Sequence, residues 1–237
     1  GSRYLDPDGS FPNHIPNPEN ETAMQSILDA VQESKADLGI IFDTDVDRAG
    51  AVLSDGTELN RNRIIAMMAA ILLREHPGTT IVTDSITSTG LAAFIRKHGG
   101  VHHRFKRGYR NVINESMRLN REGHDSQLAM ETSGHGALKE NYFLDDGAYL
   151  VTRLLIELAR AKKEGYTLES LIADLAEPAE SKEFRMNILV PDFKAYGQKI
   201  IDGNQVELPD IWMPGAEGWF VARTDKTFTV RLVRRAR

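Results

Sequence analysis

With 237 residues, the chain is long enough to bury one large hydrophobic core or two to three smaller ones. Its formal net charge of −5 argues against nucleic acid as a partner, and no apolar run approaches the roughly 20 residues that cross a bilayer. The absence of cysteine excludes disulfides and thiol chemistry and favours a cytoplasmic location.

The first part of the chain predicts a loop, a helix and a pair of strands. Residues 1–20 are rich in Pro, Asn, Asp and Gly, which indicates a loop. Asn20 can cap a helix that runs to about Lys35, because apolar residues recur on one helical face. The apolar run at 38–42 predicts a buried strand, and residues 49–53 predict the strand that returns beside it.

Three carboxylates and a guanidinium follow the first predicted strand directly. Asp43, Asp45 and Asp47 alternate along the chain, and Arg48 comes next. Like charges this close repel one another unless a cation neutralises them, and hard oxygen ligands suit Mg²⁺. A solvated turn is the alternative. An EF-hand is excluded, because its sixth position would be Arg48 and its twelfth Ser54.

From residue 61 the pattern alternates between helix and strand. Helices are expected at 61–75, 90–97, 109–119 and 147–163, and strands at 79–83, 101–105 and 127–131. Such an order implies a largely parallel sheet with helices on both faces. His102 and His103 would point to opposite faces of one strand, so we interpret them as structural.

Binding loops of these sheets lie at the carboxyl ends of the strands. Asp43, Asp84, Lys106 and Glu131 all come at or just after such an end. Beyond a helix and connector at 165–182, the pattern changes to a strand, a short helix and strands at 218–222 and 227–233. The predicted fold is therefore a mixed, largely parallel α/β protein with a smaller α+β unit at its carboxyl end.

Three segments resemble motifs of the α-D-phosphohexomutase family, which contains phosphoglucomutases and phosphomannomutases. Residues 7–18 resemble the loop that precedes the family's metal site. Residues 43–48 (Asp-Thr-Asp-Val-Asp-Arg) resemble its Asp-Gly-Asp-Gly-Asp-Arg metal loop, and residues 131–135 (Glu-Thr-Ser-Gly-His) resemble its Gly-Glu-x-Ser-Gly-His sugar loop. Residues 139–147, which end in Asp145-Asp146-Gly147, also fit, and the resemblance covers about residues 5–175.

Members of that family have four domains around a central cleft. The resemblance implies that residues 1–60 are part of domain two with the metal loop, residues 61–178 are domain three with the sugar loop, and residues 182–237 are a shortened phosphate-binding domain four. The first domain, whose phosphorylated serine donates the phosphoryl group, has no counterpart here. The resemblance therefore predicts a chain that is inactive alone and has this domain as its partner.

The resemblance also implies roles for individual residues. The metal ligands for Mg²⁺ are Asp43, Asp45 and Asp47. The catalytic residues are His135, Arg48 and Lys106, with His135 as the proton shuttle and Arg48 on the phosphate. The substrate-binding residues are Glu131, Ser133, Gly134, Arg107, Tyr109 and Arg223. As alternatives, Arg48 pairs with a ligand carboxylate, His135 is an ordinary surface residue, and Lys106 and Arg107 form a solvated basic turn.

Several positions depart from the family pattern. Thr44 and Val46 replace glycines of the metal loop, which removes backbone freedom there. Tyr109 stands where some members have a sugar-contacting histidine. Ile86 stands near the sequence position where some members have a sugar-contacting lysine. Asp225 replaces a hydroxyl residue in the phosphate loop of the last domain and would repel a phosphate.

The predicted function is phosphoryl transfer between C1 and C6 of hexose phosphates through a bisphosphate intermediate. One alternative is a haloacid-dehalogenase-type phosphatase with Asp43 as nucleophile, although its motif would have Thr or Val in place of Asp47. Another is a sugar-phosphate-binding module without catalysis. The expected location is the cytoplasm, or a plastid for a plant-like source, because residues 104–109 and 135–139 look nearest to a branch found in plants and some bacteria.

Overall fold

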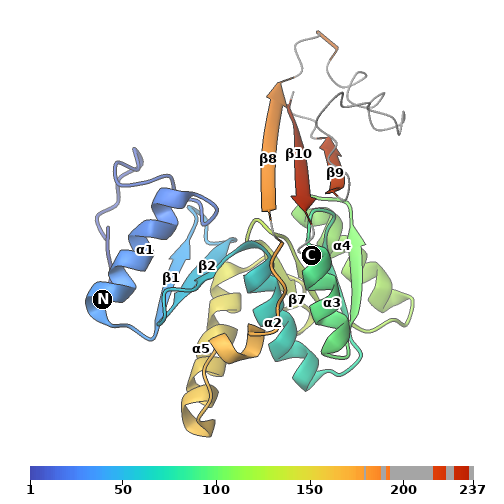
Figure 1. Cartoon of the computed structure of the whole chain (residues 1–237), viewed down its shortest axis with the longest axis horizontal. Helices are drawn as coiled ribbons and strands as arrows, with labels where there is room; N and C mark the ends of the chain where they lie inside the picture. Colours follow the sequence, from blue (N-terminus) through green and yellow to red (C-terminus); the bar gives the residue numbers. More distant parts are fainter. Residues whose placement is uncertain (179, 188–190, 193–215, 223–226, 235–237) are drawn as a thin grey trace. The chain divides into compact units, whose positions relative to one another are not determined.

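The computed structural model describes residues 1–178, 180–187, 191–192, 216–222 and 227–234. The chain divides into two compact units, Gly1–Leu175 and Ala176–Arg237 (Figure 1). Within the described ranges, no helix has both the length and the apolar character of a membrane span.

The first unit begins with one helix on a small antiparallel sheet. Helix α1 (Glu21–Ser34) starts at Asn20, whose side chain accepts a hydrogen bond from the amide of Ala23. Strands β1 (Leu38–Phe42), β2 (Ala49–Leu53) and β3 (Glu58–Leu59) pair in that order. Apolar side chains of α1 pack on β1 and β2, and Phe42 pairs with Ala49 across the loop that holds the three carboxylates (Figure 1).

The rest of the unit is a four-stranded sheet between helices. Its strand order is β5 (Val101–Phe105), β4 (Thr80–Asp84), β6 (Ser126–Met130) and β7 (Gly136–Leu138); the first three are parallel and β7 is antiparallel. The helices are α2 (Arg61–Glu75), α3 (Thr89–Lys97), α4 (Tyr109–Arg121) and α5 (Gly147–Glu164), with short 3₁₀ turns at Lys139–Asn141 and Glu169–Ile172.

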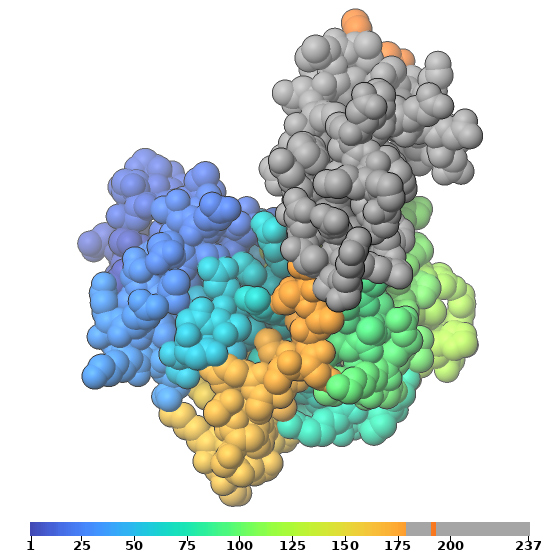
Figure 2. Space-filling view, in the orientation of Figure 1, coloured from blue at the N-terminus to red at the C-terminus, as the bar shows by residue number. Residues whose placement is uncertain are grey.

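The burial pattern confirms the prediction of a sheet covered on both faces. Ile81 and Leu128 belong to a core shared with α2, α3 and α5, whereas Val82 and Ala129 pack with α4. Neighbouring residues of one strand therefore face opposite layers, as strand geometry requires. Figure 2 shows the blue residues of the first small sheet and helix packed against cyan and gold residues of this second part.

The second unit contains an antiparallel sheet in the order β8 (Glu180–Asn187), β10 (Thr227–Arg234) and β9 (Ala216–Ala222). These strands confirm the predicted ones at 218–222 and 227–233. The predicted short helix and Arg223 lie outside the described residues. The domain limits 1–60, 61–178 and 182–237 stay a prediction.

Candidate functional site

The two loops singled out from the sequence lie against each other. Arg48 and His135 form an isolated antiparallel bridge, and the amide of Ala49 donates to the carbonyl of Gly134 at 3.3 Å. Gly134 has a φ of +99°, and a Cβ there would lie 2.8 Å from the oxygen of Ala49. Any side chain at Gly134 would therefore push the carboxylate loop and the 131–135 loop apart.

Asp43 is buried and held by Arg48. The amide of Arg48 donates to Oδ1 of Asp43 at 3.1 Å, and Nε donates to Oδ2 at 2.6 Å. Burial by itself would raise the pKa of Asp43, but these two hydrogen bonds and the Arg48 charge outweigh it and hold the pKa below its usual range. The structure thus gives Arg48 the alternative role considered above, as partner of a ligand carboxylate.

Asp45 is exposed and Asp47 half-buried, and each lies close enough to Asp43 to share a cation. One ligand oxygen from each carboxylate lies within 4.8 Å of the others. Oδ1 of Asp47 is buried, and no hydrogen-bond partner for it is found within the described part of the chain. Burial raises the pKa of Asp47 to about 6, and the Asp43 carboxylate adds to the rise. A buried oxygen that lacks a hydrogen bond among the described residues, with Nε of Arg48 3.8 Å away and repelling carboxylates around it, fits a small divalent cation.

The carboxylate loop contains a strained residue. Val46 has a φ of +66°, in the left-handed region that β-branched residues rarely adopt. Its carbonyl accepts a hydrogen bond from the amide of Gly147 at 3.0 Å, and a Cβ on Gly147 would lie 2.7 Å from that oxygen. The start of α5 therefore fixes the loop in a backbone conformation that glycine would adopt without strain.

His135 lies between two carboxylates and an aromatic ring. Its Nδ1 is 2.8 Å from Oδ2 of Asp145 and 3.6 Å from Oδ2 of Asp47. The ring of Tyr109 stacks on it, with 4.8 Å between centroids and an interplanar angle of 18°. Burial would lower the pKa of His135, but the Asp145 hydrogen bond and the nearby negative charges raise it overall.

The contact between Asp145 and His135 was not expected from the sequence. Of the successive residues Asp145 and Asp146, only Asp146 caps α5, since its Oδ1 accepts a hydrogen bond from the amide of Tyr149 at 2.9 Å. Two successive aspartates before one helix leave one of them without a capping function. That surplus was the only signal in the sequence.

Glu131 is buried, and both oxygens of its carboxylate accept hydrogen bonds from within the chain. Its Oε1 accepts the amide of Gly108 at 2.5 Å, and its Oε2 accepts the hydroxyl of Ser133 at 3.2 Å. The carboxylate therefore joins the 131–135 loop to the turn that carries Tyr109. Ser133 is half-buried, and the prediction that Glu131 and Ser133 bind sugar hydroxyls stays a prediction.

Of the two basic residues in the turn before α4, Arg107 has a buried side chain and Lys106 is exposed. The Arg107 side chain is 7% exposed and lies 4.0 Å from Asp84, whereas Lys106 is exposed. Asp84 is fully buried and accepts the hydroxyl of Thr132 at 2.9 Å. Burial raises the pKa of Asp84 to about 7, and the charge of Glu131 adds to the rise. Only Lys106 therefore matches the prediction of a basic residue open to an anionic substrate.

Two further positions behave as structural residues. His102 accepts or donates a hydrogen bond with Thr83 at 2.7 Å, and burial lowers its pKa to about 3. Ile86 is buried, so the position near the family's sugar-contacting lysine is part of the core.

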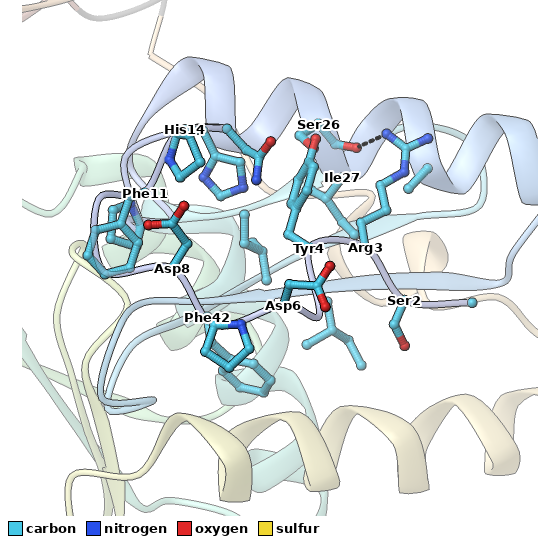
Figure 3. A pocket seen from close by; sticks show the side chains of 18 of the residues that line it. Ser2, Arg3, Tyr4, Asp6, Asp8, Phe11, His14, Ser26, Ile27 and Phe42 are labelled. Atoms are coloured by element: carbon cyan, nitrogen blue, oxygen red, sulfur yellow. Dashed lines mark hydrogen bonds between the residues drawn. The ribbon is translucent and has the colours of Figure 1, made fainter.

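A cavity of about 830 Å³ lies away from these residues. It is formed by the first residues of the chain together with faces of α1 and β1 (Figure 3). Its lining includes Phe42, which directly precedes Asp43, but none of the predicted site residues. We therefore locate the candidate site by its charged side chains and not by this cavity.

Comparison with known proteins agrees with this geometry. Residues 2–56 match the model of phosphoglucomutase/phosphomannomutase alpha/beta/alpha domain II, and residues 60–178 match domain III. A phosphomannomutase/phosphoglucomutase of Pseudomonas putida is 31% identical over an alignment of 242 positions, which covers 98% of this chain and 50% of that protein.

Solved structures give the same result. A phosphoglucomutase/phosphomannomutase family protein from Burkholderia thailandensis matches with a TM-score of 0.75 and 28% identity, covering 98% of this chain and 50% of its own. An N-acetylphosphoglucosamine mutase of Aspergillus fumigatus, solved with GlcNAc-6P and magnesium, shares the fold at a TM-score of 0.59 and 14% identity. The chain spans about half the length of the relatives described here.

Proposed function

The chain belongs to the phosphoglucomutase/phosphomannomutase family, and we propose that it supplies the metal-binding and sugar-binding loops of a phosphohexomutase. Such an enzyme moves a phosphoryl group between C1 and C6 of a hexose phosphate through a bisphosphate intermediate. The observation that carries the proposal is the backbone bridge between Arg48 and His135, which brings the carboxylate loop and the 131–135 loop together.

Asp43, Asp45 and Asp47 would hold Mg²⁺. The orphaned Oδ1 of Asp47 and the mutual proximity of the three carboxylates support this assignment. When bound, Mg²⁺ would stabilise the negative charge of the phosphoryl group during transfer. Arg48 favours the ionised form of Asp43, which a metal ligand requires, and a cation would bind the lone pairs of Asp43 that Arg48 does not use. The magnesium in the distant fungal mutase is a further reason to expect this ion.

The 131–135 loop would bind the sugar. Ser133 and the remaining lone pairs of the buried Glu131 would hydrogen-bond sugar hydroxyls, and Gly134 lets the loop lie close to the carboxylate loop. His135 would transfer the proton of the reacting hydroxyl. Lys106 and Tyr109, on the neighbouring turn, would contact the phosphate and the sugar, while Arg107 supports the turn from within.

The phosphatase alternative has little support from the geometry. Its nucleophile would be Asp43, whose side chain is 1% exposed and accepts two hydrogen bonds from Arg48. A carboxylate enclosed in this way is poorly placed to attack phosphorus. The third reading, a binding module without catalysis, describes what this chain would do in the absence of a phosphoryl donor.

The test is an assay of glucose 1-phosphate and glucose 6-phosphate interconversion, repeated with the mannose phosphates. We expect no turnover by this chain alone, because no serine here has the context of the family's phosphoserine. Addition of the separately expressed, phosphorylated first domain should restore Mg²⁺-dependent turnover. Substantial turnover by the chain alone, or none with the first domain present, would overturn the proposal.

A further inference from the structure

The hydrogen-bond partners of His135 bear on where its ring protons lie. We propose that Asp145 is a positioning residue that holds neutral His135 in the Nδ1–H tautomer and leaves Nε2 as the nitrogen that accepts a proton. This inference concerns the same site and rests on the proposed function for its role in catalysis. The tautomer itself is a property of the chain and can be measured without any reaction.

The first step of the argument is the carboxylate of Asp145, both of whose oxygens are in use. Oδ1 accepts the backbone amide of Gly136 at 3.2 Å, and Oδ2 lies 2.8 Å from Nδ1 of His135. Ala137 and Asp145 also form an antiparallel bridge, so the backbone fixes the position of the carboxylate. An ionised carboxylate can only accept, and therefore Nδ1 must carry the hydrogen.

Asp47 does not offer an equal alternative. Its nearest oxygen is 3.6 Å from Nδ1, which exceeds a hydrogen bond, and its carboxylate is assigned to the metal ion. Tyr109 covers one face of the imidazole and restricts rotation of the ring. The hydrogen bond to Asp145 and the stacking of Tyr109 together define the orientation of His135.

The consequence for catalysis is the direction of proton transfer. When a sugar hydroxyl attacks phosphorus, its O–H bond breaks and the lone pair of Nε2 takes the proton. The new bond between the sugar oxygen and phosphorus replaces the bond from phosphorus to the donor serine oxygen, which leaves with that bond's electron pair. The resulting imidazolium has one proton on each nitrogen, and the carboxylate of Asp145, 2.8 Å from Nδ1, stabilises it. Transfer in the opposite direction returns the proton from Nε2.

The isosteric variant Asp145→Asn should reverse the tautomer. The amide of Gly136 remains a donor and needs an oxygen, so Oδ1 of the new side chain should stay on Gly136. The NH₂ group would then face Nδ1 of His135, which must become an acceptor. The ring proton should move to Nε2, and the nitrogen needed for proton transfer would lose its lone pair.

Ring-nitrogen NMR of the ¹⁵N-histidine-labelled chain tests the proposal. The spectra are recorded at a pH high enough that the His135 signals no longer shift with pH, so that the ring is neutral. His135→Gln assigns the signals by removing them. We expect a protonated Nδ1 and an unprotonated Nε2 in the wild type, and the reverse in Asp145→Asn. Asp174→Asn is the matched control, since Asp174 contacts Nε2 of His98 at 3.2 Å and should leave His135 unchanged.

A wild-type ring with its proton on Nε2 would overturn the proposal, even if the Asp145→Asn chain failed to fold. An Asp145→Asn chain that keeps the Nδ1–H tautomer would also overturn it. In mutase assays with the first domain added, Asp145→Asn should lower kcat on the order of 10²-fold and change KM much less. Correct tautomers without any turnover in the wild type would refute the proposed function and leave the role of Asp145 as a positioning residue intact.

Discussion

Asp84→Asn should remove a pH dependence of stability that is opposite in sign to that of most carboxylates. Asp84 is fully buried, and burial raises its pKa from 3.8 to about 7. Because the folded state holds the proton more tightly than the unfolded state, Asp84 favours folding most below pH 3.8. This contribution declines as the pH rises and is lost above about pH 7.

The magnitude follows from the size of the pKa change. A rise from 3.8 to about 7, at about 1.4 kcal/mol per unit, corresponds to at most about 4 kcal/mol. Asparagine has the same shape and does not titrate in this range. The free energy of unfolding of the wild type, minus that of Asp84→Asn, should therefore fall by up to about 4 kcal/mol between pH 4 and pH 7.

Urea unfolding followed by far-UV circular dichroism is the appropriate assay. All helices of the described residues lie in the unit that contains Asp84, whereas both tryptophans, Trp212 and Trp219, lie in the other unit. Tryptophan fluorescence would therefore report on the wrong unit. If the difference in free energy of unfolding between the wild type and Asp84→Asn stays constant from pH 4 to pH 7, the reasoning about Asp84 is refuted.

Three further predictions concern the two loops. Calorimetry should detect weak Mg²⁺ binding by the wild-type chain, and Asp45→Asn should weaken this binding further. The control variant Asp55→Asn, in an exposed turn, should leave the Mg²⁺ affinity unchanged. Equal affinity in all three chains would exclude the carboxylate site. Val46→Gly should raise the free energy of unfolding by about 1 kcal/mol, because it relieves the left-handed backbone strain at Val46 and removes only an exposed side chain. A lower free energy of unfolding in the variant would show that no such strain is present. With the first domain added, Glu131→Ala should lower kcat/KM by roughly ten- to a hundredfold, because it removes a hydrogen-bond partner of the sugar hydroxyls. The phosphoserine content should not change, and normal sugar kinetics would disprove a role of Glu131 in substrate binding.

Most elements could be predicted because their patterns are local. Residues 61–75 and 101–105 form a helix and a strand with the predicted limits, and the carboxylate loop follows β1 as expected. Motif resemblance also identified the two loops that meet. Periodic burial and turn residues are properties of the sequence itself, so they need no knowledge of distant partners.

The partners of buried charges could not be predicted in this way. The contact of Glu131 with the amide of Gly108 and that of His135 with Asp145 depend on which turns the sheet brings together. Strand β7, only three residues long, is defined by its pairing with β6 and has little signal of its own. The left-handed backbone of Val46 likewise results from the hydrogen bond of its carbonyl to Gly147.

The most direct test of the central claim is Mn²⁺ titration of the ¹⁵N-labelled chain, because Mn²⁺ replaces Mg²⁺ at oxygen sites and broadens nearby NMR signals. If the two loops form one metal and sugar site, Mn²⁺ should first broaden the amides around Asp45 and, at the same concentration, those of Ser133 and His135. Asp45→Asn should reduce the broadening in both loops together. Broadening confined to the carboxylate loop, or centred elsewhere in the chain, would contradict the account.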